Sequence, residues 1–222
     1  MNHRVKIDTY FNEKEKEKIK NTVAEVEKRT IGEIAVVVAG QSDLYMEAEM
    51  MGGVFLSSLI AFVLTLAASK IWDIPASLWV YIPLSFIFFF PSRFLFRNIP
   101  SLKLTLMGVH RKEQAVRERA IHNFFDKGLY KTKKQTGVLF FLSLLEKKVW
   151  VLADKGIFEK MDQKTLNRFA NIVSGGMKEG RACDALCQAV REIGEALTHH
   201  FPITPGDTDE LPDGVMFDKG TQ

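Results

Sequence analysis

The chain has little cysteine, and two long stretches of it carry no charge at all. Only Cys183 and Cys187 occur among the 222 residues. This excludes a disulfide-stapled fold, and we expect two free thiols in a reducing compartment. Charged residues make up 26% of the chain and hydrophobic residues 46%. These values exclude a disordered chain, a collagen-like repeat and a coiled-coil rod. Charge is absent from residues 50–69 and again from residues 74–92.

Sequence patterns of the common phosphate-processing enzymes are also missing. There is neither a Gly-rich phosphate loop nor a Cys-x5-Arg pattern. A phosphatase needs a nucleophile or a metal-held water, together with cations for the phosphoryl oxygens. No base-reading motif accompanies the basic segments, so nucleic acid is not expected as a partner.

The two uncharged runs are each long enough for a membrane-spanning helix, which needs roughly 20 apolar residues. Three prolines interrupt the second run, as membrane helices tolerate. Trp72, Trp79 and Tyr81 lie around the connection, where aromatic side chains favour the membrane interface. We therefore predict a transmembrane helical hairpin over residues 50–97. The alternative is a pair of buried core helices in a soluble protein, each covered on all sides.

Charge predicts the orientation of this hairpin. A tight turn over residues 70–73 puts both flanks on one side of the membrane. The turn carries only Lys70, whereas five basic residues follow the second run: Arg93, Arg97, Lys103, Arg111 and Lys112. The basic side is normally cytoplasmic. The amino terminus has no apolar signal region, so we expect two spans in the cell (inner) membrane, with both termini cytoplasmic.

The flanking segments predict one α/β domain split by the hairpin, with residues 1–49 as its first part and 98–201 as its second. We expect strands at residues 33–39, 137–145 and 148–153, the last two forming an antiparallel hairpin. Amphipathic helices are expected at residues 13–28, 111–125, 162–174 and 181–200, the third stopped by Gly175 and Gly176. Asn12 and Glu15 resemble a capping pair that begins the first of them. Residues 202–222, rich in Pro, Gly and acids, predict a disordered tail.

Three segments resemble the TPM domain family, named from its thylakoid acid phosphatase and receptor-auxiliary members. They are GEIAVVVAG (residues 32–40), KKQTGVLFFLSLLEKKVWVLADKGI (133–157) and ALTHHFP (196–202). The likeness covers most of the chain outside the apolar runs and is greatest to the bacterial membrane-bound branch. It implies an α/β/α sandwich with a short mixed sheet. It also implies acid phosphatase activity, calcium binding by acidic loops, or help in assembling membrane complexes.

Two motifs depart from the family pattern. Where the family commonly has Asp-Asn-Gly before the second strand, this chain has Gln135, Thr136 and Gly137. Where the family commonly has Gly-Tyr-Gly-Leu-Glu, this chain keeps Gly156 and Glu159 but lacks the tyrosine. One expected carboxylate is therefore missing.

The best candidate for a divalent cation site, Ca²⁺ or Mg²⁺, is a set of acids near strand ends. Its members are Asp43, Asp154 and Asp162, with Glu33 and Glu159 as further ligands. The alternative is that these acids are helix caps and solubilising groups. A second candidate metal site consists of Cys183 and Cys187 with His199 or His200. The alternative is that both cysteines are small apolar side chains packed in the core by the last helix. No catalytic residue is assigned.

We therefore expect a membrane-anchored TPM-like module that assists interaction or assembly at the cytoplasmic face, with another membrane protein or complex as partner. A metal-assisted phosphatase is the first alternative. An anionic-lipid surface sensor is the second, because residues 93–134 are strongly basic and lipid attracts such segments. The basic residues predicted to face lipid are Arg93, Arg97, Lys103, Arg111 and Lys112. The same basic residues equally fit a solvated helix face.

Overall fold

The structure is a computed structural model, and it describes residues 7–72, 78–132, 134–204, 211–218 and 220. Two compact units are present. Leu44–Lys112 forms one, and the described residues on either side of that segment form the other. We call the first the hairpin unit and the second the α/β unit. The two flanks thus build one unit together, with the hairpin unit as an insertion.

The hairpin unit consists of three helices. α2 covers Met46–Trp72, α3 covers Leu78–Asn98 and the short α4 covers Pro100–Leu106. α2 already begins four residues before the first uncharged run, and most of the predicted turn is helical up to Trp72. The rest of the connection lies outside the described residues.

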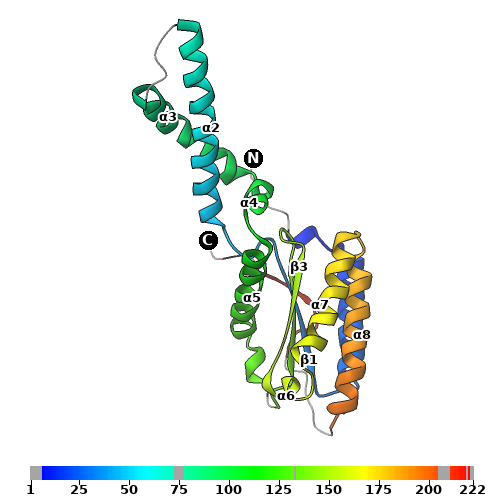
Figure 1. Ribbon diagram of the computed structural model, residues 1–222. Coiled ribbons are helices and arrows are strands. Elements are labelled where there is room, and N and C mark those ends of the chain that lie inside the picture. The colour runs from blue at the N-terminus through cyan, green and yellow to red at the C-terminus, as the bar shows by residue number, and fades with distance from the viewer. Residues whose placement is uncertain (1–6, 73–77, 133, 205–210, 219, 221–222) are drawn as a thin grey trace. The chain divides into compact units, whose positions relative to one another are not determined.

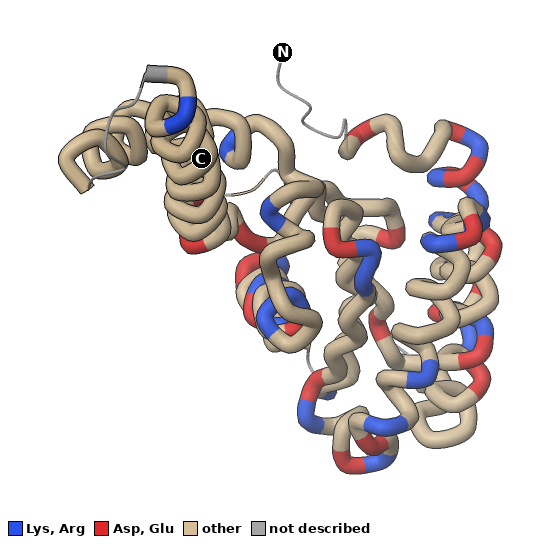
Figure 2. Tube along the Cα trace, turned by 45° about the horizontal axis from the view of Figure 1, so that its top comes forward, with Lys and Arg blue, Asp and Glu red and all other residues tan. Residues whose placement is uncertain are grey.

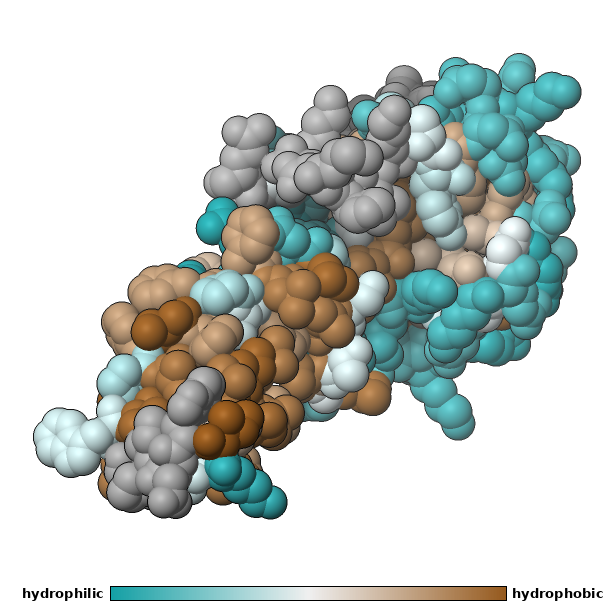
Figure 3. All heavy atoms as spheres, turned by 90° about the horizontal axis from the view of Figure 1, so that it is seen from above, coloured by the Kyte–Doolittle hydropathy of each residue, from teal (hydrophilic) through white to brown (hydrophobic). Residues whose placement is uncertain are grey.

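α2 and α3 pack closely on each other. The Ser58 hydroxyl lies 2.7 Å from the Tyr81 hydroxyl on the other helix. Gly52 allows the Phe96 ring to approach, since a Cβ there would lie 2.5 Å from a ring carbon. Both helices are long and apolar enough to span a membrane. Only 28% of the apolar window of α2 and 6% of that of α3 are buried, so they are not the covered core helices of the alternative interpretation. Figure 3 shows the resulting apolar surface in brown.

A four-stranded mixed sheet forms the centre of the α/β unit, in the order β3-β2-β1-β4. β1 covers Glu33–Ala39, β2 Gly137–Ser143, β3 Lys148–Ala153 and β4 Val215–Asp218. β1 is parallel to both β2 and β4, and β3 is antiparallel to β2. The predicted β2–β3 hairpin is confirmed.

The expectation of a disordered tail is wrong for Val215–Asp218. Composition suggested disorder because Pro, Gly and acids dominate residues 202–214. Three of the four residues of β4 instead have apolar side chains, and the backbone of the strand pairs with β1. A four-residue strand is too short to stand out by its hydrophobic pattern.

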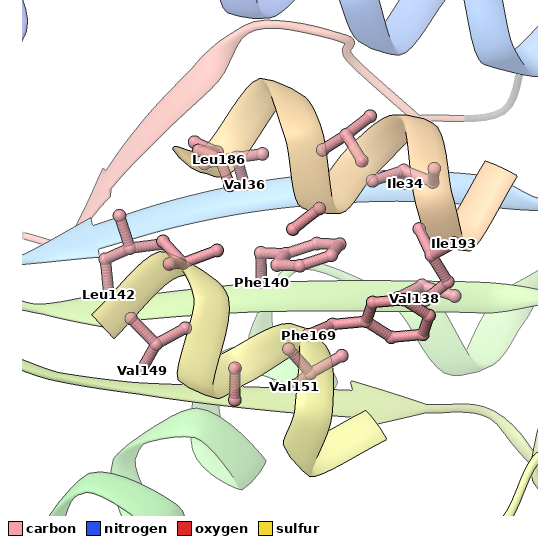
Figure 4. Packing of buried hydrophobic residues seen from close by; sticks show 14 of the residues in the cluster. Ile34, Val36, Val138, Phe140, Leu142, Val149, Val151, Phe169, Leu186 and Ile193 are labelled. Carbon is pink, nitrogen blue, oxygen red and sulfur yellow. The ribbon is translucent and has the colours of Figure 1, made fainter. Parts of the chain in front are cut away.

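Helices cover both faces of the sheet (Figure 1). α1 (Glu13–Glu27), α7 (Gln163–Lys178) and α8 (Ala182–His200) lie on one face, and α5 (Val109–Asp126) lies on the other. All seven residues of β1 are buried because alternate side chains enter the two layers. Figure 4 shows Ile34, Val36 and Phe140 packed with Leu186 and Ile193 of α8 in the first layer. The predicted α/β/α sandwich is confirmed.

Local signals explain most helix ends. Asn12 and Glu15 form the predicted capping box at the start of α1. Gly175 and Gly176 do not end α7, which continues to Lys178. A Cβ on Gly176 would lie 2.2 Å from the Ala185 Cβ, so this glycine allows α7 and α8 to pack closely. Three short helical segments complete the unit: Ile7–Thr9, Leu129–Lys131 and α6, Lys155–Phe158.

Candidate functional site

The predicted metal-binding acids are divided between opposite ends of the sheet. Glu33 begins β1, and Asp43 follows its carboxyl end. β3 runs the other way, so Asp154 returns to the end where β1 begins. Its N–H donates to the Gly137 carbonyl at 2.8 Å, and Gly137 pairs with Glu33. A seven-residue strand spans roughly 20 Å. The predicted set of Asp43 with Asp154 is therefore wrong, because the β2–β3 turn reverses the strand direction.

Asp154 and Asp162 serve as helix caps, as the alternative interpretation expected. The Asp154 carboxylate accepts from the Lys155 N–H at 2.7 Å and begins α6. Asp162 accepts from the backbone N–H and the hydroxyl of Thr165, at 2.9 and 2.8 Å. These two bonds lower the pKa of Asp162. Glu159 lies exposed at the end of α6. In the part of the chain that the structure describes, no three metal-ligating side chains gather in a group able to hold an ion.

A different acidic cluster lies where β1 begins. It consists of Glu27 at the end of α1, Glu33 on β1 and Asp213 just before β4. Glu27 accepts from the Ile34 N–H at 2.7 Å and is hydrogen-bonded to Asp213. Burial is the main cause that raises the pKa of Glu27 from 4.5 to about 9, and the nearby Glu33 and Asp213 add to it.

With its pKa raised to about 9, Glu27 is protonated at neutral pH. A protonated carboxyl is able to act as an acid. In this structure Glu27 also has a structural role, because its bond to Asp213 joins α1 to the segment that leads into β4. Sequence reasoning missed Glu27 and Asp213 because they lie far apart in the chain and Glu27 reads as one more charge on an exposed helix. Of this cluster, only Glu33 was predicted.

The carboxyl ends of β1 and β2 carry a second polar network. Glu146 accepts from the Ser42 N–H at 3.0 Å and from the Ser143 hydroxyl at 2.5 Å. The Ser42 and Ser143 hydroxyl oxygens lie 2.7 Å apart. Ser143 is fully buried and Glu146 is 8% exposed. Since Ser143 has a single proton and gives it to Glu146, the Ser42 hydroxyl must donate to Ser143.

The hydrogen bonds thus run from the partly exposed Ser42 through Ser143 to the buried Glu146 carboxylate. They hold the segment after β1 against the β2–β3 turn. The turn is held by two further backbone bonds of 3.0 Å, from Leu144 to Ala39 and from Leu145 to Gly40. The Ser42 N–H and the hydroxyls of Ser42 and Ser143 thus all have acceptors within this network. Asp43 is the next residue in the chain after Ser42.

The carboxyl end of β4 is held by the carboxylate of Asp218. The Arg119 guanidinium donates to both Asp218 oxygens, each at 2.6 Å. The Asn123 amide donates to Asp218 at 2.7 Å. Burial alone would raise the pKa of Asp218, but the bonds from Arg119, Asn123 and Gly220 lower it to about 2. Both donors lie on α5, and Asn123 is only 2% exposed. None of these residues was singled out as a candidate site from the sequence.

The five basic residues predicted to face lipid have different surroundings. Lys103 is 8% exposed and donates to the Glu49 carboxylate and the Leu44 carbonyl, so its prediction is wrong. Its long side chain turns inward from α4 because the carboxylate on α2 attracts it. Arg111 pairs with Glu47 at 2.9 Å. The other three are Lys112, which donates to the Leu104 carbonyl, the half-buried Arg93 and the exposed Arg97.

The two cysteines are core residues of α8. Cys183 is 5% exposed and Cys187 is 1% exposed. Burial and the nearby Cys187 raise the pKa of Cys183 to about 12, which keeps it protonated. His199 lies at the other end of the same helix, roughly 24 Å along its axis from Cys183. The candidate metal site that combines Cys183 with His199 is therefore wrong.

Comparison with known proteins gives one informative result. No protein family matches the chain, and neither does any curated protein. One solved structure is similar, the NMR structure of the BA42 protein from the psychrophilic bacterium Bizionia argentinensis. The TM-score is 0.59 at 19% sequence identity, over 96% of this chain and 99% of that one. At this identity the likeness concerns the fold alone.

Proposed function

We propose that the chain is a membrane-anchored, TPM-like module for interaction or assembly, with its α/β unit at the cytoplasmic face. The exposed apolar surface of the hairpin unit carries this proposal. Among the described residues, 23 of the 27 exposed large hydrophobic side chains lie between Leu44 and Val109. Burying that surface in a bilayer is favourable, whereas water penalises a patch of this extent. Figure 2 shows the tube of α2 and α3 almost entirely without charge.

Charge near the ends of the hairpin supports the proposed orientation. Arg97 lies in the last turn of α3, and Arg93 one turn earlier. Lys70, in the last turn of α2, is the one basic residue at the far end of that helix. Long cationic side chains near a span extend to the lipid headgroups, and they collect on the cytoplasmic side. The α/β unit would then face the cytoplasm and be available to a second protein.

The placement of the acids favours a module over the alternative of a metal-assisted phosphatase. Asp154 and Asp162 are engaged as caps, and Asp43 lies at the opposite end of the sheet from Asp154. A hydrolytic centre needs its groups within a few ångströms of one reacting atom. The family's phosphatase and calcium functions therefore gain no support from this arrangement.

Photo-crosslinking in intact membranes tests the proposal. A photoreactive phenylalanine analogue replaces Phe125 or Phe158, both exposed on the α/β unit, and Phe86, exposed on α3, in separate chains. We expect at least one position on the α/β unit to crosslink a defined membrane protein, and Phe86 to label lipid. The same purified full chain is assayed for phosphomonoester hydrolysis with Mg²⁺ or Ca²⁺. Activity that Asp154→Asn removes would contradict the proposal and favour the phosphatase.

A further inference from the structure

α3 and α4 are separate helices that meet at a short break. Ile99 lies between them with a φ of −117° and a ψ of 89°, which are not helical, and Pro100 begins α4. The residue before a proline disfavours the helical region, so the chain does not run straight from one helix into the other. Arg97 lies exposed in the last turn of α3. α4 therefore begins within one turn of a cation that, in the proposed anchor, reaches the lipid headgroups.

The outward side of α4 carries two different stripes of side chains. The apolar stripe consists of Ile99 and Leu106, each 39% exposed, with the half-buried Leu102 between them. The polar stripe consists of Ser101 and Thr105, both exposed, and the Thr105 hydroxyl donates to the Ser101 carbonyl at 3.0 Å. Residues three or four apart share a side of a helix, so each stripe is continuous. A helix with one apolar and one polar flank suits the boundary between hydrocarbon and water.

The inward side of α4 is held by a buried ion pair. The Lys103 ammonium lies 2.5 Å from the Glu49 carboxylate of α2 and donates to the Leu44 carbonyl at 3.1 Å. The side chains of Lys103 and Glu49 are only 9% and 10% exposed. Loss of either partner would leave a buried charge alone, which is costly. The pair therefore fixes which side of α4 faces α2, and it leaves both stripes outward.

We propose that α4 is an interfacial helix, which inserts the apolar stripe into the phospholipid layer beside the hairpin while the polar stripe faces water. The partner of the apolar stripe is thus lipid of the leaflet from which α3 emerges. The inference rests on the proposed membrane anchor and adds a third membrane contact outside both candidate spans. Interfacial helices enter the boundary by roughly 5–10 Å. Such a contact limits how far α3 can slide across the bilayer.

Lipid fits the apolar stripe better than a protein partner does. The stripe continues an apolar surface on the last turns of α3, where Phe94 is 68% and Leu95 42% exposed. The Ile99 N–H donates to the Leu95 carbonyl at 3.2 Å, so the two surfaces follow each other directly. Three partly exposed side chains are far fewer than the 20–30 residues, or about 800 Å² per partner, that a stable protein interface buries. Lipid needs no such minimum area, because the spans already hold the chain in the membrane.

Depth-dependent fluorescence quenching tests the inference on the full chain in lipid nanodiscs. Leu106→Cys and the neighbouring Thr105→Cys are made in separate chains, and each carries an NBD fluorophore. Cys183 and Cys187 are buried, and the parent chain gives the labelling background. The lipid quencher is phosphatidylcholine with a nitroxide near the headgroup end of its acyl chain. We expect it to quench the label on Leu106→Cys about threefold more strongly than that on Thr105→Cys, and iodide in water to show the reverse order.

Two nearby acids of α2 provide matched variants for the ion pair. Glu49→Gln removes the charge that holds Lys103, so lipid quenching of the label on Leu106→Cys should fall about twofold. Glu47 pairs with Arg111 where both side chains are partly exposed, and Glu47→Gln should leave the quenching unchanged. Unchanged quenching in a Glu49→Gln chain that melts like the parent would overturn the role of the pair. If Glu49→Gln melts lower, the comparison of the two labelled positions alone decides.

Three results would overturn the interfacial position of α4. The first is equal lipid quenching of the labels on Leu106→Cys and Thr105→Cys. The second is iodide quenching that is at least as strong on Leu106→Cys. The third is protection of the label on Leu106→Cys from both quenchers, which would indicate a covering protein. Each of these can occur while Phe86 labels lipid in the crosslinking test, so failure of this inference is distinct from failure of the proposed anchor.

Discussion

Arg119 on α5 and Asp218 at the end of β4 are joined by two parallel hydrogen bonds of 2.6 Å. The two residues lie 99 positions apart in the chain. The pair links the helix that covers one face of the sheet to the strand at its edge. It explains why the last strand has a fixed place on β1 although the preceding composition resembles a flexible tail.

Removing one member of this pair should destabilise the α/β unit. We expect Arg119→Leu to lower the free energy of unfolding by about 2 kcal/mol, because it leaves a largely buried carboxylate without its main donor. Arg117→Leu is the control and should change it by less than about 0.5 kcal/mol. Urea unfolding of both variants in detergent measures the difference. An equal effect of the two substitutions would contradict the assigned role.

The same pair predicts the acid limb of the stability curve. The pKa of Asp218 is about 2 in the folded chain and 3.8 ordinarily. A lowered pKa means that the folded state binds the proton less readily than the unfolded state. The stabilisation is complete above about pH 4 and is lost as the pH falls toward 2. Asp218→Asn should be less stable at neutral pH and show a shallower decline in this range.

The buried carboxyl of Glu27 predicts a decline on the alkaline side. Its pKa is about 9 when folded and 4.5 ordinarily, so between these values the folded state holds a proton that the unfolded state has released. Stability must therefore fall as the pH rises from 4.5 to 9. Glu27→Gln keeps an acceptor for the Ile34 N–H and does not titrate. We expect the melting temperature of Glu27→Gln to vary less between pH 5 and 9 than that of the parent. Identical profiles would contradict the protonated state.

Two neighbouring glycines of α7 should respond oppositely to alanine. A Cβ on Gly176 would collide with Ala185 of α8, whereas one on Gly175 meets nothing within 4 Å. We expect Gly176→Ala to cost about 1–3 kcal/mol through overpacking. Gly175→Ala should be neutral or add up to about 1 kcal/mol, since alanine favours a helix. Thermal melting of the pair measures this, and a loss of the same size in both would argue against the close α7–α8 contact.

The α/β unit should fold without the hairpin. If a Gly/Ser linker replaces residues 46–107, we expect a soluble protein that melts in one cooperative transition, because loop length costs closure entropy only slowly. Val37, fully buried in the layer under α5, provides the control. Val37→Asp should unfold the linked protein, since an unpaired buried carboxylate costs several kcal/mol. Two separate transitions would contradict a single unit.

The sequence was most informative where one local pattern determines one element. β1 and β3 begin and end at the predicted residues, because runs of Val, Leu and Ala are bounded by Gly, Lys and Asp. The α1 capping box was predicted for the same reason. Gly176 was misread as a helix stop, since the reason for a glycine there is a side chain on another helix.

The candidate site was harder to predict because its contacts are distant in sequence. Ser42 meets Glu146 across 104 positions. Which end of the sheet an acid occupies depends on strand direction, and the pairing of β4 with β1 was not visible in the sequence. Grouping Asp43 with Asp154 failed for this reason.

Membrane topology is the most direct test of the proposed function. Reporter fusions are placed after Glu47, after Lys134 and at Ile71 near the end of α2, in otherwise intact chains. We expect a cytoplasmic signal at the first two positions and an external signal at Ile71, because the proposed hairpin of α2 and α3 crosses the membrane and returns. Opposite locations for Glu47 and Lys134, or a cytoplasmic signal at all three, would contradict a membrane-anchored module with its α/β unit at the cytoplasmic face.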